Sequence, residues 1–374
     1  MSRPLVSVLL STYNRLDLLK ICLNSILSQN YANLDIIIFN DCSNDGTKEY
    51  LGTINDKRLN IFNSPKNIVQ KHGHTKVWLK MLEMSAGNLI INISDDDYWP
   101  YHGFIDECVN KFQEFNNLSK VIGNQVDYNY QDGKFKEFNY KEIQERINFK
   151  DELVYHDNMI KGGFYKSLNY LKEFSKRPLD LNISTSGTMF HKKKFLEVNA
   201  LLSDKLSKYQ GGYELLIPSS FFGDIYFIDK PRVVVGLNSK NLSFNKTQIE
   251  HLDDSILSVS NALNTVKKHK KSEFLIEEIK NFEKDILSSI INTYLSHSIL
   301  ILRNKKLSLC TNENIQGYLN LRLYIKYIRK YKCKPKIEYI LSYIVEKFIP
   351  NYLTKIYYTF YSLFKRLINR IIRI

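Results

Sequence analysis

A short apolar segment that runs straight into three consecutive aspartates is the feature that most restricts the fold of this chain. Residues 89–93 are apolar except for Asn92 and rich in β-branched side chains, as in a buried strand. Asp95, Asp96 and Asp97 follow almost at once. Carboxylates this close together repel one another unless water or a cation neutralises them. The stretch therefore predicts either a solvated acidic turn before a helix at 101–115 or a cation site at a strand end.

Predicted strands and helices alternate over residues 1–115. Short apolar runs predict strands at 5–10, 34–39, 59–62 and 89–93. Apolar residues at helical spacing predict helices at 16–29 and 74–85, with a shorter helix from residue 47. The alternation is typical of an α/β fold with a largely parallel sheet. The glycine-rich loops of dinucleotide enzymes and P-loop NTPases are missing from the sequence, which argues against both classes.

Three of these predicted strands end in polar or acidic loops. Parallel strands end at the same edge of a sheet, so the loops can surround one ligand. Tyr13 can stack on a nucleobase, and Asp41 can accept a hydrogen bond from a ring N–H. The alternative is an Asx turn that caps the next helix, which fits Asp45 better than Asp41. The side chains at this edge are Thr12, Tyr13, Asn14, Arg15, Asp41, Asp45 and the three aspartates.

The net charge indicates an anionic partner, and the cysteines indicate that the protein works in a reducing compartment. The 374 residues carry a net charge of +14, which suits nucleic acid, an acidic membrane surface or a phosphorylated substrate. No helix-turn-helix, RNP or zinc-finger pattern supports nucleic acid. The five cysteines are scattered, as free thiols are. With no signal peptide and no apolar run of about 20 residues, we expect a cytoplasmic protein.

Four segments in order carry a family resemblance. They are VSVLLSTYNR from Val6, SILSQNY from Ser25, NDCSNDGT from Asn40 and GNLIINISDDD from Gly87. Together they resemble family 2 of the inverting GT-A glycosyltransferases, strongly over residues 4–115 and weakly up to about 240. The resemblance implies a GT-A domain over 1–245. Residues 1–115 would form its nucleotide-sugar-binding half and 116–245 its acceptor half.

The resemblance also implies roles for the residues at the sheet edge. Thr12 and Tyr13 border the nucleobase with Asn14 and Arg15, and Asp41 bonds the base with Asp45 nearby. The aspartates correspond to the family's Asp-x-Asp motif, which holds Mn²⁺ or Mg²⁺ on the donor diphosphate. We expect Asp95 and Asp97 to bind the metal, Asp96 to lie by the donor sugar, and His191 to face the metal. A surface position is the alternative for His191, and likewise for His74, which falls near a basic residue of the family.

The general base is where this sequence departs from the family. An acidic pair commonly stands where this chain has Gly211 and Gly212. An inverting displacement needs a base within hydrogen-bond reach of the acceptor hydroxyl. Glu214 is the first choice, and Asp180 and Asp224 are alternatives. Glu214 could instead be a structural carboxylate at a helix start, and the whole domain could be a binding module that has lost its base.

The remainder of the chain divides into a polar stretch and a basic helical region. Residues 135–170 lack clear periodicity and predict a long loop over the donor, and 183–191 resembles the family's acceptor-lining segment. Residues 250–348 have helical spacing. The basic amphipathic segment 350–374 indicates membrane-surface binding, or else packing on protein. These features predict an enzyme peripheral to the inner face of the plasma membrane. It would transfer sugar from a UDP-linked or similar nucleotide-sugar donor to a lipid-linked glycan of O-antigen or capsule.

Overall fold

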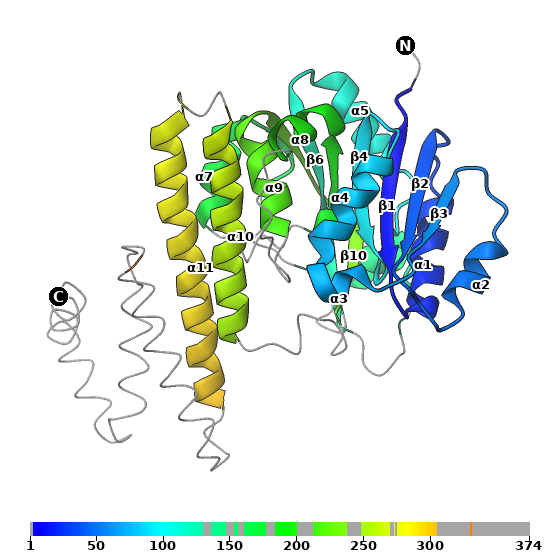
Figure 1. The fold of residues 1–374 in the computed structure, drawn as a ribbon. Coiled ribbons are helices and arrows are strands. Elements are labelled where there is room, and N and C mark those ends of the chain that lie inside the picture. The colour runs from blue at the N-terminus through cyan, green and yellow to red at the C-terminus, as the bar shows by residue number, and fades with distance from the viewer. Residues whose placement is uncertain are drawn as a thin grey trace, which may run out of the picture.

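A computed structural model describes most of the chain and shows one mixed sheet with helices packed around it (Figure 1). The described residues are 3–129, 135, 137–146, 153–155, 161–176, 184–199, 212–237, 248–269, 273, 275–304 and 330. The predicted segment 350–374 and most of the predicted helical region beyond residue 304 lie outside them, as does Asp180.

The sheet has ten strands in the order β3-β2-β1-β4-β9-β6-β10-β5, with β7 added to β6 and β8 to β10. The strands are β1 (Val6–Thr12), β2 (Leu34–Asn40), β3 (Leu59–Asn63), β4 (Leu89–Ser94), β5 (Asp97–Tyr98), β6 (Leu118–Asn129), β7 (Leu153–Tyr155), β8 (Gly163–Tyr165), β9 (Thr188–His191) and β10 (Asp224–Leu237).

The helices cover both faces of this sheet. They are α1 (Leu16–Leu27), α2 (Thr47–Gly52), α3 (Ile68–His72), α4 (His74–Met84), α5 (Phe104–Glu114), α6 (Tyr140–Arg146), α7 (Ser167–Lys176), α8 (Lys192–Asn199), α9 (Gly212–Phe221), α10 (Gln248–Lys268) and α11 (Ile276–Asn304), with a 3-10 turn η1 (Thr185–Gly187). No helix in the described part of the chain is long and apolar enough to cross a bilayer.

The N-terminal half is the parallel α/β unit that the sequence predicts. Strand β1 pairs in parallel with β2 and with β4, and β2 pairs in parallel with β3. Side chains alternate along β1: Val6, Val8 and Leu10 join α1 and α5 in one apolar cluster, while Leu9 joins α4 in another. Each large aliphatic side chain buried in this way contributes about 1.5–3 kcal/mol. The strand is therefore fixed in register by two cores at once.

The second half adds antiparallel pairing, which decides which residues reach the site. Strand β9 runs antiparallel to both β4 and β6, whereas β10 runs parallel to β6. Because β9 is reversed, its beginning lies at the edge where β4 ends. Strand β10 continues past Pro231 through a break in register to Leu237.

The predicted long loop over 135–170 is wrong for much of the range that the structure describes. Helix α6, strand β8 and the start of α7 occupy parts of that range. Asn139 and Glu142 form a capping box, in which each side chain accepts from the other's backbone N–H at 3.0 and 2.9 Å. Phe138 and Ile143 bury their side chains beside it. The asparagine–glutamate spacing was the sequence signal for this helix.

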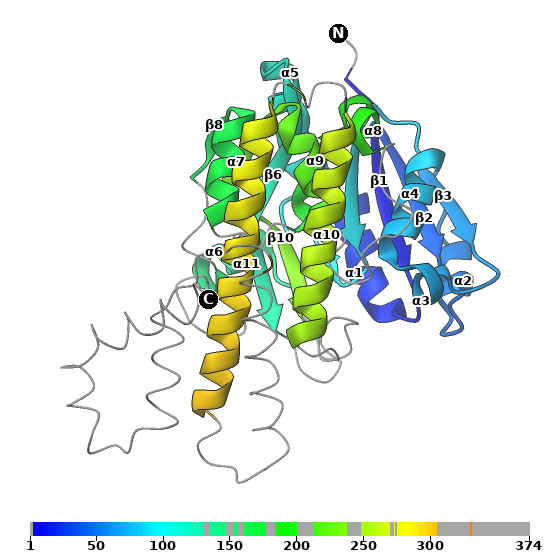
Figure 2. The same cartoon turned by 60° about the vertical axis from the view of Figure 1, so that its left-hand side comes forward.

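Helices α10 and α11 pack with α7 and α9 as a helical layer on one side of the sheet, as both views show (Figure 2). One apolar cluster runs from β6 and β10 through α7 and α9 into both long helices. The described part of the predicted helical region therefore shares its core with the sheet.

Lys120 of β6 is fully buried beneath α9, where its ammonium donates to the Leu216 carbonyl at 2.6 Å and to the Ser220 hydroxyl. Burial lowers the pKa of Lys120 to about 7, against about 10.4 in an unfolded chain. Between these values the unfolded chain binds a proton that the folded chain does not. Stability should therefore rise as pH increases from about 7 to about 10.4.

Urea denaturation at pH 7, 8.5 and 10 should show this rise in the wild type and a flatter profile in Lys120→Met. Lys48→Met, at an exposed position, is the matched control and should retain the wild-type slope. Parallel pH profiles for wild type and Lys120→Met would mean that this lysine does not govern the pH dependence.

Candidate active site

The predicted strand-end residues do meet at one edge of the sheet. Thr12 ends β1 beside Asn40 of β2, and Ser11 lies beside Ser94 of β4. The three aspartates follow Ser94, and all three are almost fully buried. They therefore form an acidic cluster in a low-dielectric setting, where an unneutralised charge is costly.

Arg15 forms ion pairs with two of the three aspartates. Its Nη1 atom lies 3.1 Å from Asp95 Oδ1 and 2.7 Å from Asp96 Oδ2. Burial raises the pKa of Asp95 to about 6; the Arg15 charge opposes that shift and the Asp96 charge adds to it. The carboxylates that share one cationic group are thus Asp95 and Asp96.

Asp97, which the sequence pairs with Asp95 as a metal ligand, has different partners from Asp95, and that pairing stays a prediction. Its Oδ2 accepts from the Ser186 hydroxyl at 2.5 Å and its Oδ1 from the Gly236 N–H at 3.1 Å. Ser186 in turn accepts from the Ser94 N–H. Burial, followed by repulsion from Asp96, raises the pKa of Asp97 well above its ordinary value. Asp97 therefore joins β5 to η1 and to β10, and does not face the shared cation.

Asp41 and Asp45 are engaged in organising the loops. The two oxygens of Asp41 accept from the Ile68 and Val69 N–H groups at 2.7 and 2.8 Å, at the start of α3. Asp41 is 1% exposed, and its predicted contact with a nucleobase stays a prediction.

Asp45 binds the first residues of two helices. Its contact with α2 is the predicted Asx turn that caps the next helix. Its carboxylate accepts from the Leu16 N–H at 2.9 Å and from the N–H and hydroxyl of Thr47. Burial raises its pKa, but the hydrogen bonds from Thr47 and Leu16 outweigh that effect and leave the pKa below its ordinary value. Asp45 thereby fixes the start of α1 relative to α2.

The loop after β1 presents an aromatic ring to solvent. Tyr13 is 43% exposed, whereas the neighbouring Thr12 is 3% exposed. Asn14 adopts φ 52° and exchanges hydrogen bonds with the next loop, donating to Ser43 and accepting from Asn44. The loop is therefore held in place while the Tyr13 ring remains available for stacking.

His191 lies at the wrong end of the sheet to bind a metal with the aspartates. It pairs with Leu89, at the beginning of β4. Six residues of strand separate Leu89 from Asp95, which is about 20 Å at 3.3 Å per residue. Asp224, an alternative base, pairs with Leu118 at this same far end. Both assignments are wrong for the same reason, the direction of the strands.

Glu214 is also not placed to act as the base. It is fully buried in α9, and its Oε1 accepts from Asn261 Nδ2 of α10 at 2.6 Å. A base must reach the acceptor hydroxyl, and this carboxylate is enclosed between two helices. The geometry supports the alternative, in which Glu214 is a structural carboxylate.

His74, for which a surface position was the alternative, lies close enough to the strand-end residues to sense their charges. It is the first residue of α4, and Gly73 before it has φ 81°. Desolvation and the charge of Arg15 lower its pKa, while Asp96 and Asp41 oppose the shift. The imidazole therefore stands within electrostatic range of the Arg15–aspartate cluster.

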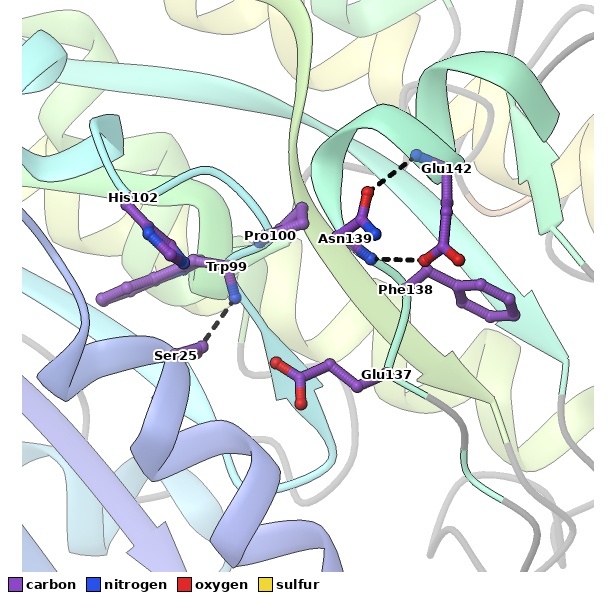
Figure 3. Close-up of a pocket in the computed structure, with 8 residues that line it drawn as sticks. All are labelled: Ser25, Trp99, Pro100, His102, Glu137, Phe138, Asn139 and Glu142. Carbon is purple, nitrogen blue, oxygen red and sulfur yellow. Dashed lines mark hydrogen bonds between the residues drawn. The ribbon is translucent and has the colours of Figure 1, made fainter.

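A separate cavity of about 190 Å³ lies beside Trp99, two residues after the last aspartate (Figure 3). Glu137 points into it, and the Trp99 N–H donates to the Ser25 hydroxyl at 3.1 Å. None of the residues expected to hold a nucleotide-sugar lines this cavity. It is thus distinct from the strand-end cluster.

Comparison with known proteins identifies the family. A family model described as Glycosyl transferase family 2 matches residues 7–195, half of the chain. The chain belongs to this family. TarS residues 1–349 of S. aureus, solved with UDP-GlcNAc, superposes with a TM-score of 0.55 at 14% identity, covering 87% of this chain and 82% of that one. This likeness confirms the GT-A fold.

Two Escherichia coli proteins are similar to about a quarter of the chain. WcaA of strain K12, a glycosyl transferase assigned to colanic acid biosynthesis, is 31% identical over 100 residues, 26% of this chain and 34% of WcaA. WfaP, named UDP-Glc:alpha-D-GlcNAc-diphosphoundecaprenol beta-1,3-glucosyltransferase, is 35% identical over 95 residues, 25% of this chain and 36% of WfaP. The chain thus matches about a third of the length of these relatives.

Proposed function

We propose that this protein transfers a sugar from a nucleotide-sugar donor, most simply a UDP-sugar, to a lipid-linked glycan during synthesis of a bacterial surface polysaccharide. The observation that carries the proposal is the pair Asp95 and Asp96 sharing one cationic group at a strand-end edge. The exposed Tyr13 ring at the same edge supports a nucleobase platform. The names of TarS with UDP-GlcNAc and of WfaP support the donor and acceptor classes.

A divalent cation fits this site by the chemistry of its ligands. Mg²⁺ and Mn²⁺ prefer oxygen atoms and commonly bridge one or two carboxylates and a diphosphate. The guanidinium between the two carboxylates shows that they accept a shared positive charge. No group of three or more His, Cys, Asp or Glu side chains within the described residues is arranged as a metal site. We assign Asp95 and Asp96 as the protein ligands, with Asp97 positioning the turn that carries them.

The proposed reaction is a single displacement with inversion at the anomeric carbon. The acceptor oxygen forms the new bond to that carbon as the bond to the diphosphate oxygen breaks, and a base takes the acceptor proton. A bound Mn²⁺ or Mg²⁺ would neutralise the leaving diphosphate. Tyr13 would stack on the base, and Asp96 would lie nearest the donor sugar. Of the acidic residues considered for the base, Asp180 alone is not excluded by its position, since it lies outside the described residues.

Calorimetric titration with UDP, GDP and dTDP, each with Mn²⁺ and with EDTA, tests the donor site. We expect UDP to bind at least tenfold more tightly with Mn²⁺ than with EDTA, and more tightly than the other two nucleotides. Equal binding with EDTA would overturn the metal assignment, and preference for GDP or dTDP would overturn the UDP assignment. A folded protein that binds none of them would contradict the proposed function.

The burial of Glu214 and the glycines at 211 and 212 favour a second candidate, a sugar-nucleotide-binding module without catalysis. Transferases commonly release sugar to water slowly in the absence of acceptor. Release of free sugar from the bound donor would support transfer chemistry. Tight donor binding without any release, and without transfer to lipid-linked acceptors, would support the binding module.

We also propose that the basic segment 350–374 binds the inner surface of the plasma membrane. Each basic residue near an anionic leaflet contributes about 1 kcal/mol. Replacing Arg366, Arg370 and Arg373 by Glu should reduce co-sedimentation with vesicles containing phosphatidylglycerol by at least tenfold, without changing UDP affinity. Vesicle binding that survives the triple change would contradict this assignment.

A further inference from the structure

The side chain of Arg15 occupies the position that a cation would take at the proposed donor site. One atom, Nη1, contacts both Asp95 and Asp96, at 3.1 and 2.7 Å. The aspartate side chains are 7% and 11% exposed, whereas that of Arg15 is 26% exposed. The carboxylates are thus more enclosed than the Arg15 side chain, which is the most exposed of the three.

The backbone around Arg15 is held while its side chain reaches across to another strand end. Asp45 accepts from the N–H of Leu16, the next residue, and the preceding Asn14 is bonded to the neighbouring loop. Arg15 itself is the N-cap residue of α1 and makes no side-chain capping bond there. Moving its guanidinium therefore requires rotation about side-chain bonds and no rearrangement of the helix.

Charge makes Arg15 and a divalent cation compete for the same carboxylates. Two aspartates and one guanidinium leave a single net negative charge. A divalent cation added to this cluster would meet the positive charge of Arg15 at contact distance, where repulsion is strong. A donor diphosphate changes the balance because guanidinium groups bind phosphate oxygens through a planar, two-pronged set of donors.

We propose that Arg15 is an exchange residue, which holds Asp95 and Asp96 until a nucleotide diphosphate draws its guanidinium away and releases them for the metal. This inference rests on the proposed function. It predicts that nucleotide and metal bind with positive cooperativity. Because coupling is reciprocal, Mn²⁺ must strengthen UDP binding by the same factor as UDP strengthens Mn²⁺ binding. The device would keep the acidic cluster neutralised between turnovers.

Titration with Mn²⁺ alone tests the exchange directly, without any activity measurement. In Arg15→Ala the affinity for Mn²⁺ in the absence of nucleotide should increase at least tenfold over wild type. With UDP present, wild type should gain at least tenfold in Mn²⁺ affinity, whereas the variant should gain less than about threefold, and the variant should bind UDP more weakly. Arg15→Gln, which keeps a hydrogen-bond donor but no charge, should behave like Arg15→Ala and guards against misfolding of either variant.

Arg3→Ala is the matched control. Arg3 pairs with Asp106 ahead of β1, at the opposite end of that strand from Thr12. Its loss removes one positive charge from the protein and should leave both Mn²⁺ and UDP affinities unchanged. An effect of equal size in this control would assign the change to net charge and overturn the proposal.

Two other results would also overturn it. Unchanged or weaker Mn²⁺ binding in both Arg15 variants would show that Arg15 does not compete with the metal. Undiminished coupling between UDP and Mn²⁺ in those variants would show that it does not carry the cooperativity. Failure of UDP to bind wild type under any condition would instead contradict the proposed function, while the nucleotide-free titration still tests the competition.

Discussion

Asp96→Asn should reduce sugar transfer at least about a hundredfold and leave the fold intact. Asp96 makes the shorter of the two contacts with Arg15, at 2.7 Å, and is the most exposed of the three buried aspartates at 8%. The amide has the same shape but no charge, so it cannot neutralise a divalent cation. Losing one preorganised electrostatic contact in a catalytic site typically costs 10²–10³ in rate, about 2.7–4 kcal/mol. Turnover with a UDP-sugar and Mn²⁺, beside thermal denaturation, measures both effects.

Asp97→Ala provides the contrasting outcome. The change leaves the Gly236 N–H and the Ser186 hydroxyl without their acceptor in a buried position, which costs about 1–3 kcal/mol for each unsatisfied group. We therefore expect a loss of stability in this variant and unchanged stability in Asp96→Asn. Full activity of Asp96→Asn, together with loss of Mn²⁺ binding in a stable Asp97→Ala protein, would restore the pairing of Asp95 with Asp97.

The part of the fold that the sequence predicts well is the part determined by local patterns. In β1, β2, β4, α1 and α4, apolar patterns alone mark each element, because these strands are buried on both faces and each helix buries one stripe. Parallel connections then place the strand ends together. The resulting acidic edge follows from residues that are close in sequence to a strand end.

The direction of a strand is what the sequence could not supply. Both His191 and Ser186 belong to the segment 183–191 that was expected to line the acceptor cavity, with His191 facing the metal. Antiparallel pairing of β9 with β4 puts Ser186 beside Asp97 and moves His191 to the far end, beside Leu89. Antiparallel and parallel pairing depend on long-range contacts, and the local pattern of a four-residue strand is the same in either direction.

Interactions between residues far apart in sequence were equally unpredictable. Arg15 and Asp96 are 81 residues apart, and Glu214 meets Asn261 from another helix. From sequence alone, a glutamate at a helix start is expected to be accessible to solvent. Only the tertiary structure shows that other helices cover it. The buried position of Glu214 follows from the packing of α10 on α9, which no short motif encodes.

Arg232→Met should produce the largest loss of stability among substitutions remote from the site, about 3 kcal/mol. Arg232 of β10 is 3% exposed and forms a two-pronged ion pair with Glu107 of α5, at 2.7 and 3.3 Å. It also donates to the Tyr140 hydroxyl at 2.7 Å and lies over the Tyr101 ring at 4.3 Å. One guanidinium thereby joins the sheet to α5 and α6.

The expected size follows from what the substitution leaves behind. Removing one partner of a buried ion pair costs about 3–5 kcal/mol, because the other charge remains without compensation. The Glu107 side chain keeps 30% exposure, so the lower end applies. Arg3→Ala, which breaks the exposed pair with Asp106, should cost no more than about 1 kcal/mol in the same urea denaturation. If the charge on Glu107 is the cause, adding Glu107→Gln to Arg232→Met should recover part of the loss. A double variant no more stable than the single one would instead assign the cost to the lost packing on Tyr101 and Tyr140.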